Sequence, residues 1–380
     1  MLEKIKQLSG KKKLWLGALT ALLLLYPIIP FHALDMDIGG YSLRLSVLNN
    51  EYTLHIIVLI MLYMLLSCGL NIIPGYTGLL DLGFVGFYGI GAYTSALLTV
   101  KFATMAYPLG LLGNFWVILF FAGLNGAMFG VLLGAPTLRL TGDYFAIVTF
   151  GFSELVVLII LNETKLTNGP MGIRGIMPPT IGSFEFSSEK SFYYLILFML
   201  IMVIIFLKRL EKSKIARAWF AIRENEIAAE AVGIDIIKYK VGAFAISAAI
   251  GAIGGAFYAR WMLFISPDMF KFWESVLILC MIILGGLGSI RGVLVGALIL
   301  TSLSEILRSV LPYAEEVIRP IVNIELVGAR YAIYGLVLII MMRFRPEGLL
   351  PSSRVTHEMH PATDAVLEAQ TDTFWDKRNM

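Results

Sequence analysis

The sequence contains few of the residues on which metalloenzymes and disulfide-stabilised proteins depend. Two of its 380 residues are cysteines, Cys68 and Cys280, and both lie inside long apolar runs. Cysteines so placed form neither a disulfide framework nor a cysteine-rich metal cluster. The four histidines are dispersed, and the HEMH at 357–360 lacks the HExxH spacing of zinc peptidases. We therefore expect no metal site in this chain.

Motifs for nucleotide hydrolysis and covalent catalysis are also missing. The sequence has no GxxxxGK[ST] phosphate-binding loop and no Ser/His/Asp set, so we expect neither enzymatic activity nor a bound cofactor. Few ionisable side chains interrupt the apolar runs. Glu305 and Arg308 are three residues apart and can pair with each other. Glu154 has no partner nearby in the sequence, so it is either part of a substrate pathway or a carboxylate facing a wet crevice.

Long hydrophobic segments make up most of the chain. Hydrophobic residues account for 58% of it, the mean hydropathy is +0.80, and several apolar runs have the length of a membrane-spanning helix. These runs are continuous rather than alternating, which excludes a β-barrel. The sequence predicts an all-α polytopic integral membrane protein of about ten transmembrane helices. They are expected at 14–29, 52–73, 82–100, 109–134, 144–161, 192–207, 241–262, 276–284, 292–303 and 330–342.

The distribution of positive charge predicts the topology. With both termini in the cytoplasm, twenty of the thirty Lys and Arg fall in inner segments, and the others are scattered singly. This bias follows the positive-inside rule and predicts that both termini are cytoplasmic. Residues 1–351 are expected to form the transmembrane domain. Residues 352–380 are polar and of mixed charge, which is typical of a disordered tail.

The 36 glycines indicate close packing between helices. Two sets recur at intervals of four residues: Gly126, Gly130 and Gly134, and Gly288, Gly292 and Gly296. Two breaks in the apolar pattern, at 74–83 and 285–292, each precede a glycine-spaced segment. Their corresponding positions in the two halves of the chain suggest a degenerate internal repeat, which is common in transporters.

The stretch 208–240 differs from the rest because thirteen of its thirty-three residues are charged. A charge at a helix centre costs about 2.5–3.5 kcal/mol on insertion into a membrane, so this stretch is expected to lie in water. Asn225 is a good N-cap for a short helix, and Gly233 supplies its C-terminal stop. Glu226 and Glu230 are like charges four residues apart, an unfavourable pair unless a cation lies nearby. Such a helix either docks onto another protein or lies on lipid headgroups.

Several stretches resemble the membrane permeases of ABC importers for branched-chain amino acids, specifically the LivM type. They are GLLDLGFVGFYGIGAYTSALL at 78–98, LRLTGDYFAIVTFGFSELV at 138–156, TNGPMGI at 167–173, RAWFAIRENEIAAEAVGI at 217–234, ILGGLGSIRGVLVGA at 283–297 and RFRPEGLL at 343–350. These matches extend in family order from the second expected helix to the end of the tenth. The resemblance implies a type II-like ABC importer permease in the bacterial plasma membrane.

The resemblance also implies a coupling loop at 208–240 that docks into a groove of a cytoplasmic ATPase. Ala228, Ala229 and Gly233 match its AAxxxG motif, whose first Glu is replaced by Ile227. The coupling residues expected on this basis are Arg223, Asn225, Glu226, Ala228, Ala229, Glu230 and Gly233. The implied partners are ATPase subunits that bind ATP and Mg, a second homologous permease, an extracytoplasmic substrate-binding protein and membrane lipid, with no nucleic acid.

Two departures from the family pattern limit what the resemblance implies. Family members often place an arginine shortly after the glutamate that matches Glu154, whereas FSELVV here has none. The tail beyond Pro351 is unmatched. Related permeases import urea, short amides or sugars, so the substrate stays open among these and hydrophobic amino acids. A channel, a secondary carrier or a purely structural membrane subunit are alternatives that would leave 208–240 without an ATPase partner.

Overall fold

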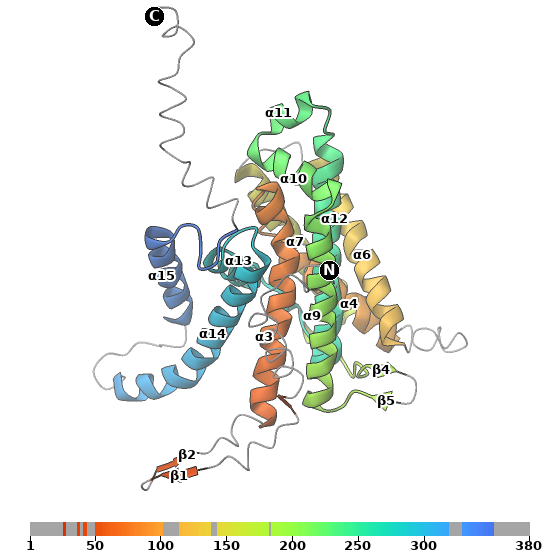
Figure 1. The fold of residues 1–380 in the computed structure, drawn as a ribbon. Coiled ribbons are helices and arrows are strands. Elements are labelled where there is room, and N and C mark those ends of the chain that lie inside the picture. Colours follow the sequence, from red (N-terminus) through yellow and green to blue (C-terminus); the bar gives the residue numbers. More distant parts are fainter. Residues whose placement is uncertain are drawn as a thin grey trace, which may run out of the picture.

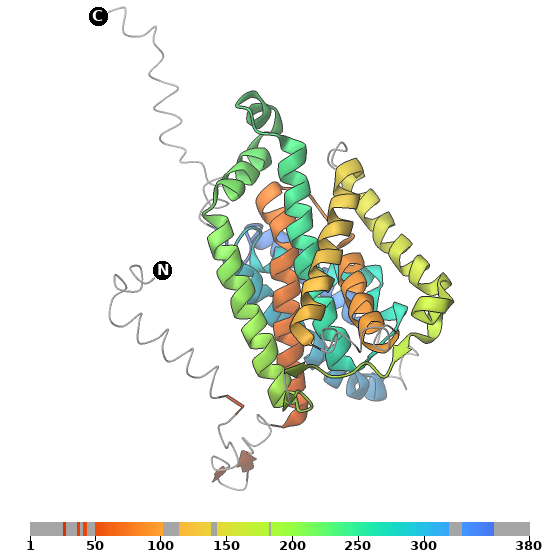
Figure 2. The same cartoon turned by 90° about the vertical axis from the view of Figure 1, so that its right-hand side faces the viewer.

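The computed structural model describes residues 26–27, 36–38, 41–43, 50–101, 114–137, 143–181, 184–318 and 329–352. Within these residues, six helices are long and apolar enough to cross a membrane (Figures 1 and 2). They are α3 (Glu51–Leu70, followed by the π-helix η3, Ile73–Thr77), α6 (Phe115–Thr137), α7 (Asp143–Asn162), α9 (Glu189–Glu211), α12 (Ile236–Met262) and α14 (Ile290–Ile318). The mostly helical, multi-pass architecture that the sequence predicts is thus confirmed.

Shorter elements complete the described structure. The helices are α4 (Phe84–Ala96, followed by η4, Leu97–Lys101), α8 (Thr164–Thr167), α10 (Lys214–Glu224), α11 (Glu226–Ala231), α13 (Phe272–Gly285) and α15 (Ala329–Phe344), with short 3-10 turns η6 (Gly169–Met171) and η7 (Pro267–Phe270). The strand pairs are β1 (Met36–Ile38) with β2 (Tyr41–Leu43), β3 (Ile173–Arg174) with β6 (Phe264–Ile265), and β4 (Thr180–Ile181) with β5 (Phe184–Glu185), all antiparallel. The expected helix at 14–29 lies almost wholly outside the described residues, as does the tail from 353 onward.

Helix α12 is the central element, and glycines let its neighbours approach it closely. It packs against both α4 and α6. A Cβ atom on Gly126 of α6 would lie 2.7 Å from the carbonyl oxygen of Ala248, and one on Gly130 would lie 2.7 Å from the Cβ of Ala248. Both distances are shorter than any real contact of such atoms, so neither position has room for a larger side chain.

Three predicted boundaries are wrong because helices continue past residues that usually end them. The sequence predicts a break at Pro74–Gly75, but the chain there forms the π-helix η3 and turns at Gly78, whose φ is 75°. The wider π turn accommodates the proline near its first residue, where the missing N–H removes little. Pro136 is likewise inside the last turn of α6. Helix α14 runs to Ile318, well past residue 303, where the sequence predicts its end.

The loop at 162–191 is more ordered than the sequence predicts, and it closes the end of the bundle opposite α11 (Figure 1). Strand β3 of this loop pairs with β6, directly after α12. Buried Arg260 donates from Nε to the carbonyl oxygen of Met177, at 3.1 Å. Glu189, at the start of α9, interacts with His55 of α3 at 3.1 Å and accepts a hydrogen bond from Trp261 of α12 at 3.1 Å. These polar contacts fix three helices at this end.

Candidate coupling surface and transport elements

Helices α10 and α11 project from one end of the bundle (Figures 1 and 2), and local capping explains their bounds. The Ser213 hydroxyl accepts from Ala216 N at 3.2 Å to start α10, and Asn225 Oδ1 accepts from Ala228 N at 3.0 Å to start α11. Gly233, with φ 87°, ends α11 as predicted, since its left-handed backbone is costly for other residues. Asp235 then caps α12 by accepting from Lys238 N at 3.1 Å. The eleven-residue helix α10 directly precedes Asn225.

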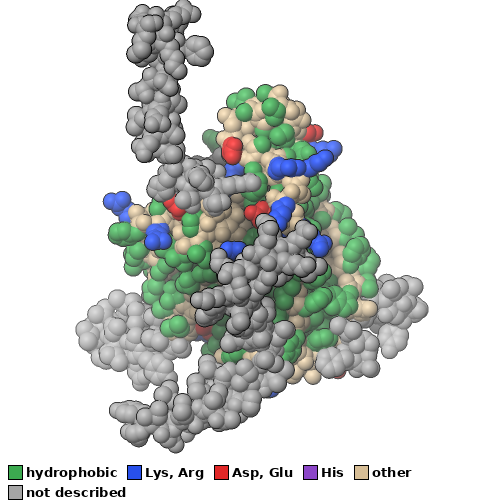
Figure 3. Space-filling model, in the orientation of Figure 1, with side chains coloured by type: hydrophobic (Ala, Val, Ile, Leu, Met, Phe, Trp, Pro, Cys, Tyr) green, Lys and Arg blue, Asp and Glu red, His purple; other side chains and the backbone are tan. Residues whose placement is uncertain are grey.

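The apolar face of α10 is anchored in the bundle. Trp219 is fully buried and donates from Nε1 to the carbonyl oxygen of Tyr239 at 2.7 Å. Its ring stacks on Tyr76 of η3 with the centroids 6.3 Å apart, and Phe220 meets the same tyrosine edge-on at 5.2 Å. The opposite face of α10 carries exposed Lys214 and Arg217. Figure 3 shows basic side chains on the half of the visible face nearer α11 and hydrophobic ones over much of the rest. Helix α10 therefore packs as part of the protein and does not lie as a free helix on lipid.

A buried ion pair fixes α11 to α12. Lys240 is 1% exposed, and its Nζ lies 2.6 Å from Oε1 of Glu226. The Glu226 side chain is 39% exposed, so the carboxylate meets water on one side and the ammonium on the other. The cation that the like-charged Glu226 and Glu230 were expected to need is thus Lys240, from the first turns of α12.

The water-facing side of α11 carries large apolar side chains. Ile227 is 81% exposed and Val232 is nearly as exposed, although both are large hydrophobic residues. Ala228, Glu230 and Gly233 are also exposed. Exposed hydrophobic side chains grouped on one short element mark a surface that meets another molecule.

One expectation about this surface is wrong. Ala229, expected to present a small face together with Ala228, is 3% exposed and is buried by the chain itself. Successive side chains of a helix point about 100° apart, so adjacent Ala228 and Ala229 do not share one face. The exposed apolar side chains of this surface are those of Ile227, Ala228 and Val232.

Arg223, at the end of α10, joins this unit to the two broken segments. Its Nη1 donates to the carbonyl oxygen of Gly75 in η3 at 2.7 Å. Gly75 in turn contacts Gly288, since a Cβ atom on Gly75 would lie 2.8 Å from the Gly288 Cα. Buried Asn71 of α3 accepts a hydrogen bond from Gly288 N at 3.0 Å. The breaks at 74–83 and 285–292, which the sequence marks as related, therefore touch each other beneath the charged stretch.

The second glycine set lies in the hairpin of α13 and α14. A Cβ atom on Gly292 would lie 2.7 Å from Leu350 O, and one on Gly296 would lie 2.8 Å from Gly285 N. Gly288 differs from these two, because it is in the turn with φ 76° and not on a helix face. In the first set, Gly134 is buried near the end of α6.

The segment 345–350 covers the α13–α14 hairpin. In this segment Leu349 N and Leu350 N donate to Leu284 O and Gly285 O, both at 3.0 Å.

The ionisable residues of the apolar segments have charged partners. Glu154, on α7, is partly buried and lies near enough to Lys271, just before α13, for the two charges to interact. Glu305 and Arg308 pair as predicted, with Arg308 Nη1 3.6 Å from Glu305 Oε1. The described residues contain no group of three or more His, Cys, Asp or Glu that could hold a metal ion.

Sequence reasoning misses Lys240 and Asn71. Lys240 pairs with a residue fourteen positions away, and no local spacing predicts such a contact. Asn71 had a usable signal, because an amide inside an apolar run directly before Pro74-Gly75 is costly unless it is hydrogen-bonded. It therefore indicates a backbone partner at the break.

These features define a multi-pass membrane protein with closely packed helices and a projecting helical unit, α10–α11, at one end. The family model described as the permease component of branched-chain amino acid transport systems matches residues 52–342. The chain belongs to this family. It is accordingly a transport component of the membrane and not an enzyme.

Curated relatives agree with the family. The chain is 38% identical over 325 residues to the high-affinity branched-chain amino acid transport system permease protein LivM of Escherichia coli, covering 80% of this chain and 71% of the relative. It is 28% identical to a probable LivM permease of Methanocaldococcus jannaschii, covering 77% and 92%. A nucleoside ABC transporter permease of Lactococcus lactis, NupC, is 24% identical over 48% of this chain and 59% of the relative. None of the solved structures matches this chain.

Proposed function

We propose that this chain is the membrane-spanning permease subunit of an ATP-driven importer in the bacterial plasma membrane. Its α11 surface would dock onto a separate ATPase that binds ATP and Mg. The observation that carries this proposal is the exposed pair Ile227 and Val232 on a helix held rigidly by the Lys240–Glu226 pair and the Trp219 anchor. A secondary carrier or channel has no need of such an element.

We propose branched-chain amino acids as the substrates. The support is the family match together with 38% identity to a branched-chain amino acid permease over 80% of the chain. The nucleoside permease is more distant and covers about half of the chain. No observation favours urea, short amides or sugars. A substrate-binding protein and a second, homologous permease complete the proposed complex.

The proposed topology has ten spans with α11 and both termini in the cytoplasm. Exposed basic residues near α11, such as Lys208, Arg209 and Lys212, support that side as cytoplasmic. Residues 1–351 would form the permease domain, with 208–240 as its coupling loop and 352–380 as a cytoplasmic tail. Glu154 is proposed as a pathway residue on the basis of its partial burial in α7.

The experiment is a pull-down of the ATPase subunits with the full-length chain from detergent. Ile227→Asp and Val232→Asp each place a charge in the docking contact, where an unpaired buried charge costs several kcal/mol. Since about 1.4 kcal/mol changes affinity tenfold, both variants should lose the ATPase while still inserting into the membrane. Met171→Asp is the matched control, because Met171 is also highly exposed but lies in the loop at the opposite end. ATPase retained by both α11 variants would contradict the proposal and favour a helix that meets lipid headgroups.

A further inference from the structure

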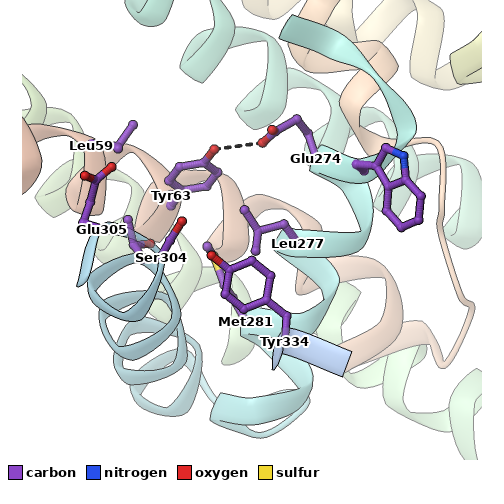
Figure 4. Close-up of a pocket in the computed structure, with 10 residues that line it drawn as sticks. Leu59, Tyr63, Glu274, Leu277, Met281, Ser304, Glu305 and Tyr334 are labelled. Carbon is purple, nitrogen blue, oxygen red and sulfur yellow. Dashed lines mark hydrogen bonds between the residues drawn. The ribbon is translucent and has the colours of Figure 1, made fainter. Parts of the chain in front are cut away.

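A cavity of about 140 Å³ lies between α3, α13, α14 and α15 (Figure 4). This volume is close to that of an engineered cavity, of about 150 Å³, that admits benzene. The ten lining residues are Leu59, Tyr63, Trp273, Glu274, Leu277, Met281, Thr301, Ser304, Glu305 and Tyr334. In Figure 4, Tyr63, Ser304, Glu305 and Tyr334 come together from three helices around a common space.

The polar part of the lining is rich in hydrogen-bond acceptors. Glu274 Oε2 accepts from the Tyr63 hydroxyl at 2.8 Å, and a carboxylate has lone pairs for further donors. Glu305 lines the cavity beside Ser304, and its ion pair with Arg308 is long, at 3.6 Å, and exposed on the arginine side. Such a pair is screened and weak, so the Glu305 carboxylate can accept a better donor.

Thr301 is an independent indication of a ligand. Its side chain is 2% exposed and lines the cavity, and its Oγ1 has no hydrogen-bond partner among the described residues. A buried hydroxyl without a partner is unfavourable, so its position here calls for a polar group in the cavity.

The remaining lining is apolar. It includes Leu59 of α3 and Leu277 and Met281 of α13, and Trp273 contributes a ring at the start of α13. A bare inorganic cation gains nothing from such a wall. A ligand that matches the whole cavity has several donors on a compact charged group and a short hydrocarbon chain beside it.

We propose that this cavity binds the primary ammonium group of a short, branched hydrophobic amine, and that the imported amino acid enters it ammonium first. The three donors of the ammonium meet Glu274, Glu305 and the Thr301 hydroxyl, and the branched chain lies on Leu59, Leu277 and Met281. The carboxylate of the amino acid is left at the mouth, toward Arg308. The identification of the amine as substrate rests on the proposed function, whereas the chemistry of the cavity does not.

Equilibrium binding to the full-length chain, purified in nanodiscs with its co-purifying subunits and without a binding protein, tests this proposal. The probes are radiolabelled leucine, 3-methylbutylamine, which keeps the ammonium and the branched chain, and 4-methylpentanoate, which replaces the ammonium by a carboxylate. Leucine and 3-methylbutylamine should compete for one site, and 4-methylpentanoate should not compete. Glu274→Gln and Glu305→Gln should each weaken amine binding at least tenfold, because a charge-assisted hydrogen bond becomes a neutral one. Glu163→Gln, at an exposed carboxylate after α7, is the control and should bind normally.

Thr301→Val distinguishes a role of the hydroxyl in amine binding from a role in the stability of the fold. It keeps the side-chain shape and removes the unpartnered hydroxyl, so amine binding should fall about threefold to tenfold while the Tm stays equal or rises. A lower Tm with unchanged binding would show a structural role and overturn the proposal. Equal competition by 4-methylpentanoate, or by methylamine and 3-methylbutylamine alike, would also overturn it. Leucine uptake by a complex that binds no amine refutes the proposed amine site in the cavity and leaves the proposed function intact. Amine binding by a complex that imports no leucine supports the cavity and refutes the proposed substrate.

Discussion

The ion pair between Lys240 and Glu226 should be asymmetric in its response to mutation. Lys240 is buried, whereas Glu226 is 39% exposed. Glu226→Gln leaves a buried ammonium with a neutral partner. Lys240→Met removes the buried charge and keeps an apolar stem of similar length, and water can then solvate Glu226. We therefore expect Glu226→Gln to loosen α11 more than Lys240→Met does.

The magnitude follows from the burial of each partner. Removing one member of a fully buried pair costs about 3–5 kcal/mol, whereas an exposed pair contributes about 0–1 kcal/mol. With one partner buried and the other partly exposed, Glu226→Gln should cost about 2 kcal/mol. This corresponds to roughly a thirtyfold increase in the local opening of α11. For Lys240→Met we expect less than about 1 kcal/mol, because no buried charge remains.

Hydrogen–deuterium exchange of the amides at 226–231 measures this opening directly. Glu230→Gln is the control, since it removes the same charge from an exposed position on the same helix. Global unfolding can be followed in parallel with a thiol-reactive dye, because Cys68 and Cys280 are both buried. The reasoning is refuted if Lys240→Met opens α11 more than Glu226→Gln, or if Glu230→Gln matches Glu226→Gln.

Two further predictions concern packing and the contact below α10. Gly126→Ala should destabilise the protein by about 1–3 kcal/mol, because its Cβ would lie 2.7 Å from Ala248 O. Gly151→Ala is the control and should be neutral, because nothing lies within 4 Å of its Cβ position. The dye assay compares their Tm values, and equal values would contradict the α6–α12 contact. Arg223→Lys should leave ATPase binding intact but lower substrate uptake about tenfold in proteoliposomes, because a lysine does not reproduce the planar donor geometry at Gly75 O. Uptake by Arg223→Lys at the wild-type level would show that the Arg223–Gly75 hydrogen bond has no role in transport.

Helix existence was predictable because the signal is local and strong. The runs behind α3, α9 and α12 are long and apolar, and their polar caps, Asn50, Ser188 and Asp235, stand directly before them in the sequence. The bounds failed where a local stop signal competed with tertiary packing. Pro74 predicts an end to α3, yet η3 continues because Asn71 and Gly288 stabilise that segment from outside. No rule based on one segment contains that information.

The backbone bounds of the coupling surface were predictable, but the side of α11 that faces water was not. Asn225 and Gly233 determine where α11 begins and ends, and both are visible in the sequence. The side of so short a helix that faces water depends on how α10 and α12 hold it, through Trp219 and Lys240. For this reason the burial of Ala229 could not be deduced from the AAxxxG match. The cavity was equally hidden, because its residues come from four helices.

The contacts around Gly75 give the coupling surface a physical route to the cavity. Arg223 holds the Gly75 carbonyl in the π-helix η3, and Asn71 holds the Gly288 N–H in the turn between α13 and α14, so both bonds are made to backbone groups. Gly288 begins the turn into α14, whose backbone lies against α13 at Gly285 and Gly296 too closely for the two helices to slide independently. A displacement of α10 that carries Gly75 must therefore either break these hydrogen bonds or move the α13–α14 hairpin as a unit. Because Glu274 is on α13 and Glu305 is on α14, a movement of the hairpin against α3 changes the cavity between them.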